Sequence, residues 1–196
     1  MTVINTLKRQ PTELDYSDPT KFKFSINKLP TVEFFTTAAN IPGVNLGEAV
    51  FPTPFKAIPT QGDELTFENL EIQFLVDEKL TNYREIHKWL VGIGFPKSRE
   101  QFESFRKEFS EVFPTNTQNK GSILNTGNAI NQAAMYGDAN LLVMSSKNNP
   151  LIEVRFSDLF PVALSGLQFD QQLTDTTYLT ATATFSYKMY EMFVTE

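Results

Sequence analysis

Apolar and polar side chains alternate in several stretches of the chain, a pattern typical of strands with one buried and one exposed face. The first stretch, residues 22–26, places two Phe residues and Ile26 on one side. A second run, residues 32–38, is rich in Phe and Thr, and the break at residues 28–31 predicts a hairpin between the two runs. We therefore expect the fold to begin with two paired strands.

Four prolines mark the segment from Ile41 to Thr60, which still carries several large apolar side chains. Because each proline removes a hydrogen-bond donor from a sheet, this segment is expected to be an edge strand or an extended arm. Such a segment can lie on a neighbouring molecule or pass as a long loop over its own core, and both alternatives stay open. A turn is expected at residues 61–64, followed by a long strand to Val76 that bulges near residues 68–69.

Apolar residues recur at three-to-four spacing from Leu80 to Ile93, which predicts a helix that Asp77 can cap. The capping-box pattern at residues 98–101 predicts a second helix, with an apolar stripe from Phe102 to Phe113. The polar tract of residues 115–137 is expected to be a long surface loop.

The last 60 residues return to strand patterns. Residues 140–146 and 151–156 flank a turn signal and predict a hairpin, whereas the apolar run 159–167 is broken by Pro161 and Gly166. The clearest alternation runs from Leu179 to Met189. Its second face is polar and nearly uncharged, which suits a solvated sheet or a water-filled lumen, and comprises Thr180, Thr182, Thr184, Ser186 and Lys188.

Strands dominate this pattern, so we expect a mainly β protein, a β-barrel or sandwich with a flanking α-helix. A helical and loop insertion is expected around residues 98–137. Residues 1–20 are polar and contain two prolines, and they are interpreted as an N-terminal arm to a single domain spanning residues 21–196.

Composition removes several classes of function. The chain has no Cys and one His, His87, so disulfides, thiolate sites and zinc sites with several imidazoles are excluded within one chain. A net charge of −6 disfavours tight binding of nucleic-acid phosphates. No apolar run approaches the roughly 20 residues of a membrane helix, so no membrane partner is expected.

Candidate chemistry is sparse. His87 lies beside Arg84 and Lys88 on the predicted helix without a positioned partner for acid–base work, so a structural or solvent-facing role is favoured. The adjacent carboxylates at 63–64 and 77–78 fit a turn and a helix start better than a catalytic pair. No phosphate-binding loop, nucleophile elbow or metal-ligand spacing occurs. We expect no catalytic residue, no metal, no cofactor and no enzyme activity.

Several short motifs occur in a fixed order along the chain. They are Asp18 to Phe22 at the first strand, Thr36 to Gly43, the proline-marked segment, Gly62 to Leu70, Val76 to Glu78 before the helix with Trp89, Phe160 to Val162, and the final strand with Tyr187. This order resembles the tail tube protein family of contractile-tailed bacteriophages, including tube-like baseplate proteins and related secretion-system tubes. The resemblance spans residues 18–94 and 141–193.

The resemblance implies a structural virion protein that forms homo-hexameric rings. These rings stack into a tube inside a contractile sheath, and the channel serves DNA ejection. The implied partners are the sheath protein, baseplate and tail-terminator proteins, a tape-measure protein in the lumen, and DNA that passes without specific binding. The implied location is the virion tail, assembled in the host cytoplasm.

Two groups of residues are the candidate sites of such a protein. The segment from Glu48 to Thr60 matches the family region that reaches towards neighbouring subunits, and its apolar members, expected to contact other subunits, are Val50, Phe51, Phe55 and Ile58. The residues expected to face the lumen are Thr180, Thr182 and Thr184. Two alternatives remain: a baseplate-proximal tube initiator or tube terminator of the same fold, and a monomeric ligand-binding β-barrel with Phe and Met side chains around an apolar cavity.

Overall fold

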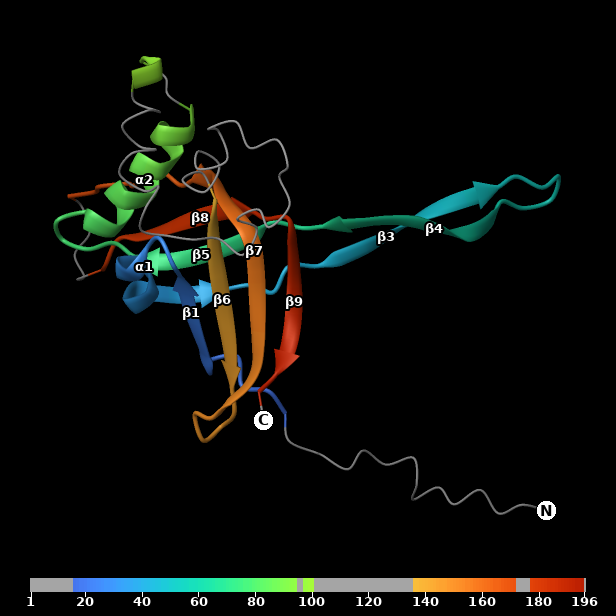
Figure 1. The fold of residues 1–196 in the computed structure, drawn as a ribbon, viewed down its shortest axis with the longest axis horizontal. Coiled ribbons are helices and arrows are strands. Elements are labelled where there is room, and N and C mark those ends of the chain that lie inside the picture. The colour runs from blue at the N-terminus through green and yellow to red at the C-terminus, as the bar shows by residue number, and fades with distance from the viewer. Residues whose placement is uncertain (1–15, 95–96, 101–135, 172–176, 196) are drawn as a thin grey trace, which may run out of the picture.

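The structure, a computed structural model, describes residues 16–94, 97–100, 136–171 and 177–195. As expected, the fold is mainly β with a flanking helix (Figure 1). The elements in chain order are β1 (Phe22–Ile26), α1 (Pro30–Phe35), β2 (Thr36–Ala39), β3 (Val44–Phe51), β4 (Ile58–Phe67), β5 (Leu70–Leu75), α2 (Thr81–Gly94), β6 (Gly137–Met144), β7 (Pro150–Leu164), β8 (Thr180–Ser186) and β9 (Met189–Val194). The second predicted helix and the polar tract fall largely on residues 101–135, outside the described residues.

Two antiparallel sheets share one long strand, β7. The first half of β7 pairs with β6 and β9, and β6 pairs with β1. The second half of β7 pairs with β8, which continues through β5 to β2. In Figure 1 the strands β6, β7 and β9 run across β5 and β8, so the two sheets face each other around a common interior.

A bend in β7 makes this sharing possible. Asp158 has φ of 54°, in the left-handed region that Asp adopts more readily than most residues. Its backbone N–H donates to Asp138 Oδ1 at 3.3 Å, and the β6–β7 register shifts beside Asp138. The strand predictions for residues 151–156 and 159–167 therefore belong to one continuous strand, which passes through Pro161 because the bend redirects it into the second sheet.

The core lies between the sheets and is closed at one end by α2. Alternate residues of β1, β5, β7 and β8 point inward and are almost fully buried, among them Phe24, Ile72, Phe74, Val154, Phe156, Ala183 and Phe185. From α2, Ile86 and Trp89 are buried, and the Trp89 ring lies 6.1 Å from that of Phe185. Period-two burial in strands and a one-sided helix thus produce a single apolar interior.

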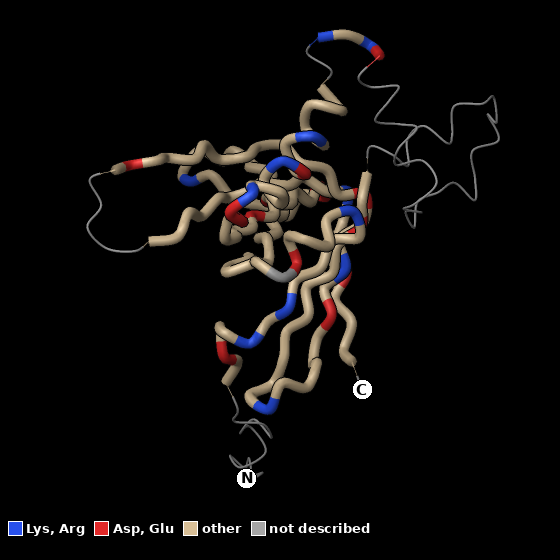
Figure 2. Tube along the Cα trace, turned by 90° about the vertical axis from the view of Figure 1, so that its left-hand side faces the viewer, with Lys and Arg blue, Asp and Glu red and all other residues tan. Residues whose placement is uncertain are grey.

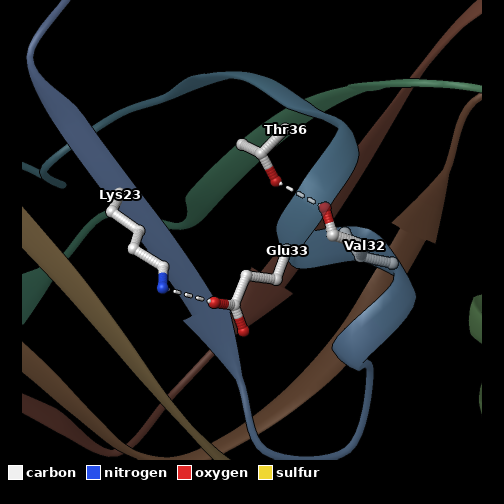
Figure 3. Close-up of polar contacts among 4 residues, drawn as sticks. All are labelled: Lys23, Val32, Glu33 and Thr36. Carbon is white, nitrogen blue, oxygen red and sulfur yellow. Dashed lines mark hydrogen bonds and ion pairs between the residues drawn. The ribbon is translucent and has the colours of Figure 1, made fainter.

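The predicted strand at residues 32–38 is wrong in its first half, which forms the short helix α1. Pro30 occupies the first turn, where its missing N–H costs nothing, and the helix places Val32 fully inside the core. Lys23 Nζ lies 2.9 Å from Glu33 Oε1, and Thr36 Oγ1 donates to the Val32 carbonyl at 2.8 Å (Figure 3). The predicted hairpin is also wrong, because β1 pairs with β6 and β2 pairs with β5.

Four further details differ from the prediction. Residues 61–64 are not a turn but lie within β4, and the strand expected to run from residue 65 to 76 is divided into β4 and β5 at residues 68–69. Asp77 does not cap α2 with its side chain; its carbonyl accepts the Leu80 N–H at 2.8 Å, one residue before the helix begins. Met189 is exposed and starts β9, because the final alternating strand ends at Ser186.

Candidate functional site: a projecting hairpin arm

The proline-marked segment forms β3, the turn and the start of β4 in a two-stranded hairpin that projects away from both sheets (Figure 1). We call residues 44–67, which comprise β3, β4 and their turn, the arm. The strands pair from Val44↔Phe67 at the sheets to Phe51↔Ile58 at the far end. The structure therefore contradicts the alternative of a loop over the chain's own core, and contact of this segment with a neighbouring molecule stays a prediction.

The arm exposes large apolar side chains along its whole length. Phe55 in the turn is fully exposed at 100%, and Phe51 is 63% exposed. Further exposed apolar residues are Val44, Leu46, Val50, Ile58 and Leu65. Contiguous apolar exposure of this kind is rare on monomeric proteins and marks surfaces that contact other molecules.

The four predicted contact residues come together at the end of the arm. We call residues 50–58 the arm tip, where Phe51 pairs with Ile58, Val50 pairs with Pro59 just beyond, and Phe55 lies in the connecting turn. Lys56 is the single charged residue of the tip. In that turn the Thr53 hydroxyl bonds the Lys56 carbonyl and accepts the Lys56 N–H. The structure thus gathers these residues into one apolar surface.

A pair of glycines allows the two strands to approach closely in the middle of the arm. The pairing register shifts between Leu46 and Glu48. A Cβ atom added to Gly62 would lie 2.4 Å from the carbonyl oxygen of Gly47, far inside van der Waals contact. Glycine is therefore required at position 62 for this crossing of the strands.

Four aromatic rings hold the arm at its base. We call Phe67, Phe156, Tyr187 and Tyr190 the root cluster. Phe67 at the end of β4 lies edge-on to Tyr187 and Tyr190, with ring centres 6.2 and 5.7 Å apart. Phe156 of the core lies 5.1 Å from Tyr187. Edge-to-face contacts of this kind are favourable, so the arm is joined to the core by packing as well as by the backbone.

Two phenol groups in the root cluster donate hydrogen bonds to the backbone on either side of the arm. Tyr187 OH donates to the Glu68 carbonyl at 2.8 Å, and Tyr190 OH donates to the Pro42 carbonyl at 3.1 Å. Burial raises the pKa of Tyr187 to about 12, with smaller contributions from Tyr190 and Glu68. The phenol therefore stays protonated and able to donate over the whole neutral range.

The three predicted lumen residues lie along β8 on the face opposite the core. Thr180 is exposed and Thr182 and Thr184 are partly buried, whereas Ala181 and Ala183 between them are buried. Across the neighbouring strand β5 the partners of Thr182 and Thr184 are Gln73 and Glu71. The predicted alternation is confirmed, and the face is polar, with a carboxylate contributed by β5.

The rest of the described surface offers little chemistry. His87 is solvent-exposed on α2, in a shallow depression of about 460 Å³ lined by Thr81, Arg84, Glu85, His87, Lys88 and Val91. Within the described residues no three His, Asp or Glu side chains are placed to hold a metal ion. None of the helices in this part of the chain is both long and apolar enough to span a membrane. In the view of Figure 2, segments of both charge signs occur along the sheets.

The fold and the arm together define a small, mainly β protein with a projecting hairpin that exposes apolar side chains. Residues 4–193 match the phage tail tube protein family, and the chain belongs to that family. Comparison with curated proteins gives no significant match.

Solved structures with the same fold come from contractile injection systems. A chain of the anti-feeding prophage (AFP) baseplate aligns with a TM-score of 0.52 and 10% identity, over 93% of this chain and 97% of that chain. A chain of the AFP tube terminating cap aligns with a TM-score of 0.52 and 12% identity over the whole of both chains. A chain from the sheath/tube terminator of an extracellular contractile injection system, PVC, in its extended state aligns with a TM-score of 0.51 and 14% identity. This alignment covers 92% of this chain and 99% of that chain. At these identities the likeness shows a shared fold.

Sequence reasoning located the arm tip but missed its supports. Tyr190 and Pro42 lie 148 positions apart, so no local pattern pairs them. Tyr187 was assigned to the core-facing side of the final strand. It is buried as expected but lies just after β8, and the partner of its hydroxyl depends on tertiary structure. Gly62 was interpreted as a turn residue, whereas it lies within β4 at a close crossing of the two strands.

Proposed function

We propose that this protein is a tube subunit that forms hexameric rings, and that these rings stack into a tail tube inside a contractile sheath. The exposed apolar arm tip carries the proposal, because such a surface needs a protein partner to cover it. Membership of the tail tube family supports a structural role in a phage tail or tail-like particle. Ring closure would also cover the free edges of β1, β2 and β9.

In this proposal the threonine face of β8 lines a channel through which DNA is ejected. Hydroxyl groups beside Glu71 offer phosphates neither a cationic surface nor a stacking surface, which favours passage over binding. A tape-measure protein would occupy the channel before ejection. The outer partners would be the sheath, baseplate and tail-terminator proteins, and assembly would take place in the host cytoplasm. Residues 1–20 would act as an N-terminal arm, separate from the arm of residues 44–67. Residues 98–137 would be an insertion into the single domain of residues 21–196.

The first test is electron microscopy of the purified protein, with mass measurement over a concentration series. We expect rings that stack into tubes as concentration rises. A strict monomer at high concentration would contradict self-assembly and favour the ligand-binding β-barrel.

Charge introduced at the arm tip should block assembly without unfolding the subunit. In the single subunit the side chain of Phe51 is 63% exposed and that of Phe55 is 100% exposed. Phe51→Asp and Phe55→Asp each replace one of these exposed rings with a carboxylate. We expect melting temperatures within a few degrees of the parent and loss of rings and tubes in micrographs. Phe169→Asp, at a 73% exposed Phe in the loop after β7, is the matched control. Normal tubes formed by both arm variants would exclude the arm as an assembly contact.

A second candidate is a component at one end of the tube, an initiator near the baseplate or a terminator. The similar structures from the AFP baseplate and from the AFP tube terminating cap favour considering it. The two candidates differ in whether both ring faces can stack. Discrete rings that never elongate, under conditions in which the subunits associate fully, would identify an end component.

A further inference from the structure

The sheet of β1, β6, β7 and β9 extends beyond the core at its lower end in Figure 1. One residue from each strand lies in register there: Phe22 pairs with Val143, Val143 with Ile152, and Ile152 with Val194. All four are apolar. We call them, together with Met192 two residues before Val194, the apolar row.

The apolar row lies on the core-facing side of this sheet. On β7, side chains alternate between the faces, and Ile152 shares its face with Val154 and Phe156, which are 0% and 1% exposed. At the row this cover ends: Ile152 is 37%, Met192 53% and Val194 80% exposed. Phe22 and Val143 are partly buried, so the row continues the core, and among the described residues nothing covers its members on β7 and β9.

The opposite face of the same strands has a different character. It carries Lys23 from β1, Glu153 and Arg155 from β7, and Glu191 from β9, with Arg155 Nη2 2.7 Å from Glu153 Oε2. The same face also carries Leu151 and Phe193, which are 48% and 40% exposed, with the Arg155 guanidinium 4.7 Å from the centre of the Phe193 ring. This face therefore mixes apolar and charged side chains, whereas the row carries no charge.

We propose that the arm tip of a second copy of this chain packs on the apolar row. This inference rests on the proposed function, in that it assumes self-assembly, and it deepens that function by naming the two surfaces that meet. The chain's own arm cannot pack on its own apolar row, because the arm projects sideways from the sheets while the row lies at the lower end of the strands (Figure 1).

Chemistry and area favour this pairing. The row carries no charge and the tip carries one, Lys56, so little desolvation of charge opposes contact. A standard interface buries roughly 800 Å² per partner. The fully exposed Phe55 can contribute about 150–250 Å², and the partly exposed Phe51, Val50 and Ile58 add smaller areas. Met192 is an unbranched, flexible side chain that adapts to an incoming ring.

A contact between two different surfaces of one chain has a consequence for assembly. It is heterologous, so every subunit offers a free tip and a free row, and association continues into a ring or a filament. A symmetric dimer, in which the same patch meets itself, would instead stop at two copies.

Complementation between two single variants tests the pairing. Phe55→Asp disables the tip and leaves the row intact, whereas Val194→Asp disables the row and leaves the tip intact. Both residues are largely exposed, so circular dichroism and melting temperature should match the parent. We expect each variant alone to be monomeric and an equimolar mixture to form 1:1 dimers that grow no further. A mixture that stays monomeric where the parent associates would overturn the proposal.

Engineered cysteines give a second, direct test, because the chain has no Cys of its own. The double variant Phe55→Cys/Val194→Cys should form a ladder of disulfide-linked chains on mild oxidation. The control is the double variant Phe55→Cys/Tyr178→Cys, in which the second cysteine stands at a 77% exposed residue before β8. This control should give no ladder. Tubes without cross-links, or equal ladders in both variants, would overturn the pairing and leave the proposed function intact. Cross-links in short oligomers without tubes would support the pairing and contradict the tube.

Discussion

Lys28 places an ammonium group against the apolar end of the core beside α2. The residue is 5% exposed, and its Nζ lies 4.9 Å from the centre of the Trp89 ring. Burial lowers the pKa of Lys28 to about 7, and the negative charge of Asp138 opposes this shift. In the unfolded chain the same group titrates near its ordinary pKa of 10.5.

This difference predicts a pH dependence of stability. Between about pH 7 and 10 the unfolded chain binds a proton at Lys28 that the folded chain has lost, so the free energy of unfolding should rise with pH. Lys28→Met should flatten the profile in this window, and denaturant unfolding at several pH values measures it. Lys188→Met, at an exposed lysine, is the control and should retain the slope. An unchanged slope in Lys28→Met would contradict the assignment.

Tyr187 predicts a separable effect on the arm. Tyr187→Phe keeps the ring in the root cluster and removes the hydrogen bond to the Glu68 carbonyl. We expect a loss of about 1 kcal/mol in unfolding free energy. Amide exchange should become faster for Glu68, whose N–H donates to the Gly43 carbonyl across the arm base. Tyr178→Phe, at an exposed tyrosine, should change neither quantity.

At the scale of elements, we expect substitution of Gly62 to distort the arm locally. Gly62→Ala forces a Cβ against the Gly47 carbonyl, and the crossing of β3 and β4 must shift to relieve it. Because the arm packs on the sheets through its base, the melting temperature should fall little while assembly is impaired. Changes in NMR chemical shifts that are confined to residues 44–67 would show that the distortion is limited to the arm. Gly166→Ala is the matched control, since an added Cβ there meets nothing within 4 Å; shift changes of equal extent in both would contradict the prediction.

Elements with strong local patterns were predicted from sequence, and those determined by tertiary structure were not. The alternation in β1 and β8 and the helical spacing in α2 agree with the structure. The short helix α1 was missed because its Phe and Thr content favours strand, whereas burial of Val32 and the pairing of β1 with β6 decide the outcome. The edge strand β9 was missed because most of its side chains are exposed and give no alternation.

At the scale of the molecule, the sequence predicted the apolar arm tip and could not predict what surrounds it. Val50, Phe51, Phe55 and Ile58 lie near one another along the chain, so an extended segment brings them together. The apolar row draws its residues from four strands, from Phe22 on β1 to Met192 and Val194 on β9. Such a surface exists only once the register of the sheet is known.

The threonine face of β8 predicts a functional effect in the assembled particle. Replacing Thr180, Thr182 and Thr184 with lysine should leave the subunit folded, because none of these side chains lies in the core. In a phage carrying this variant, cationic side chains should hold DNA phosphates and reduce infectivity if the face lines the channel. Substitution of the same three residues with serine is the control. Full infectivity of the lysine variant would exclude this face from the lumen.

The shared strand β7 has a mechanical consequence. Two sheets that met only through side chains could slide or separate under load by exchanging apolar contacts. Here a single backbone runs from Pro150 to Leu164 through both, hydrogen-bonded to β6 and β9 at one end and to β8 at the other. Force applied to either sheet is transmitted by covalent bonds, and separating the sheets requires shearing a row of hydrogen bonds at once. A subunit built this way resists pulling and twisting as one rigid piece.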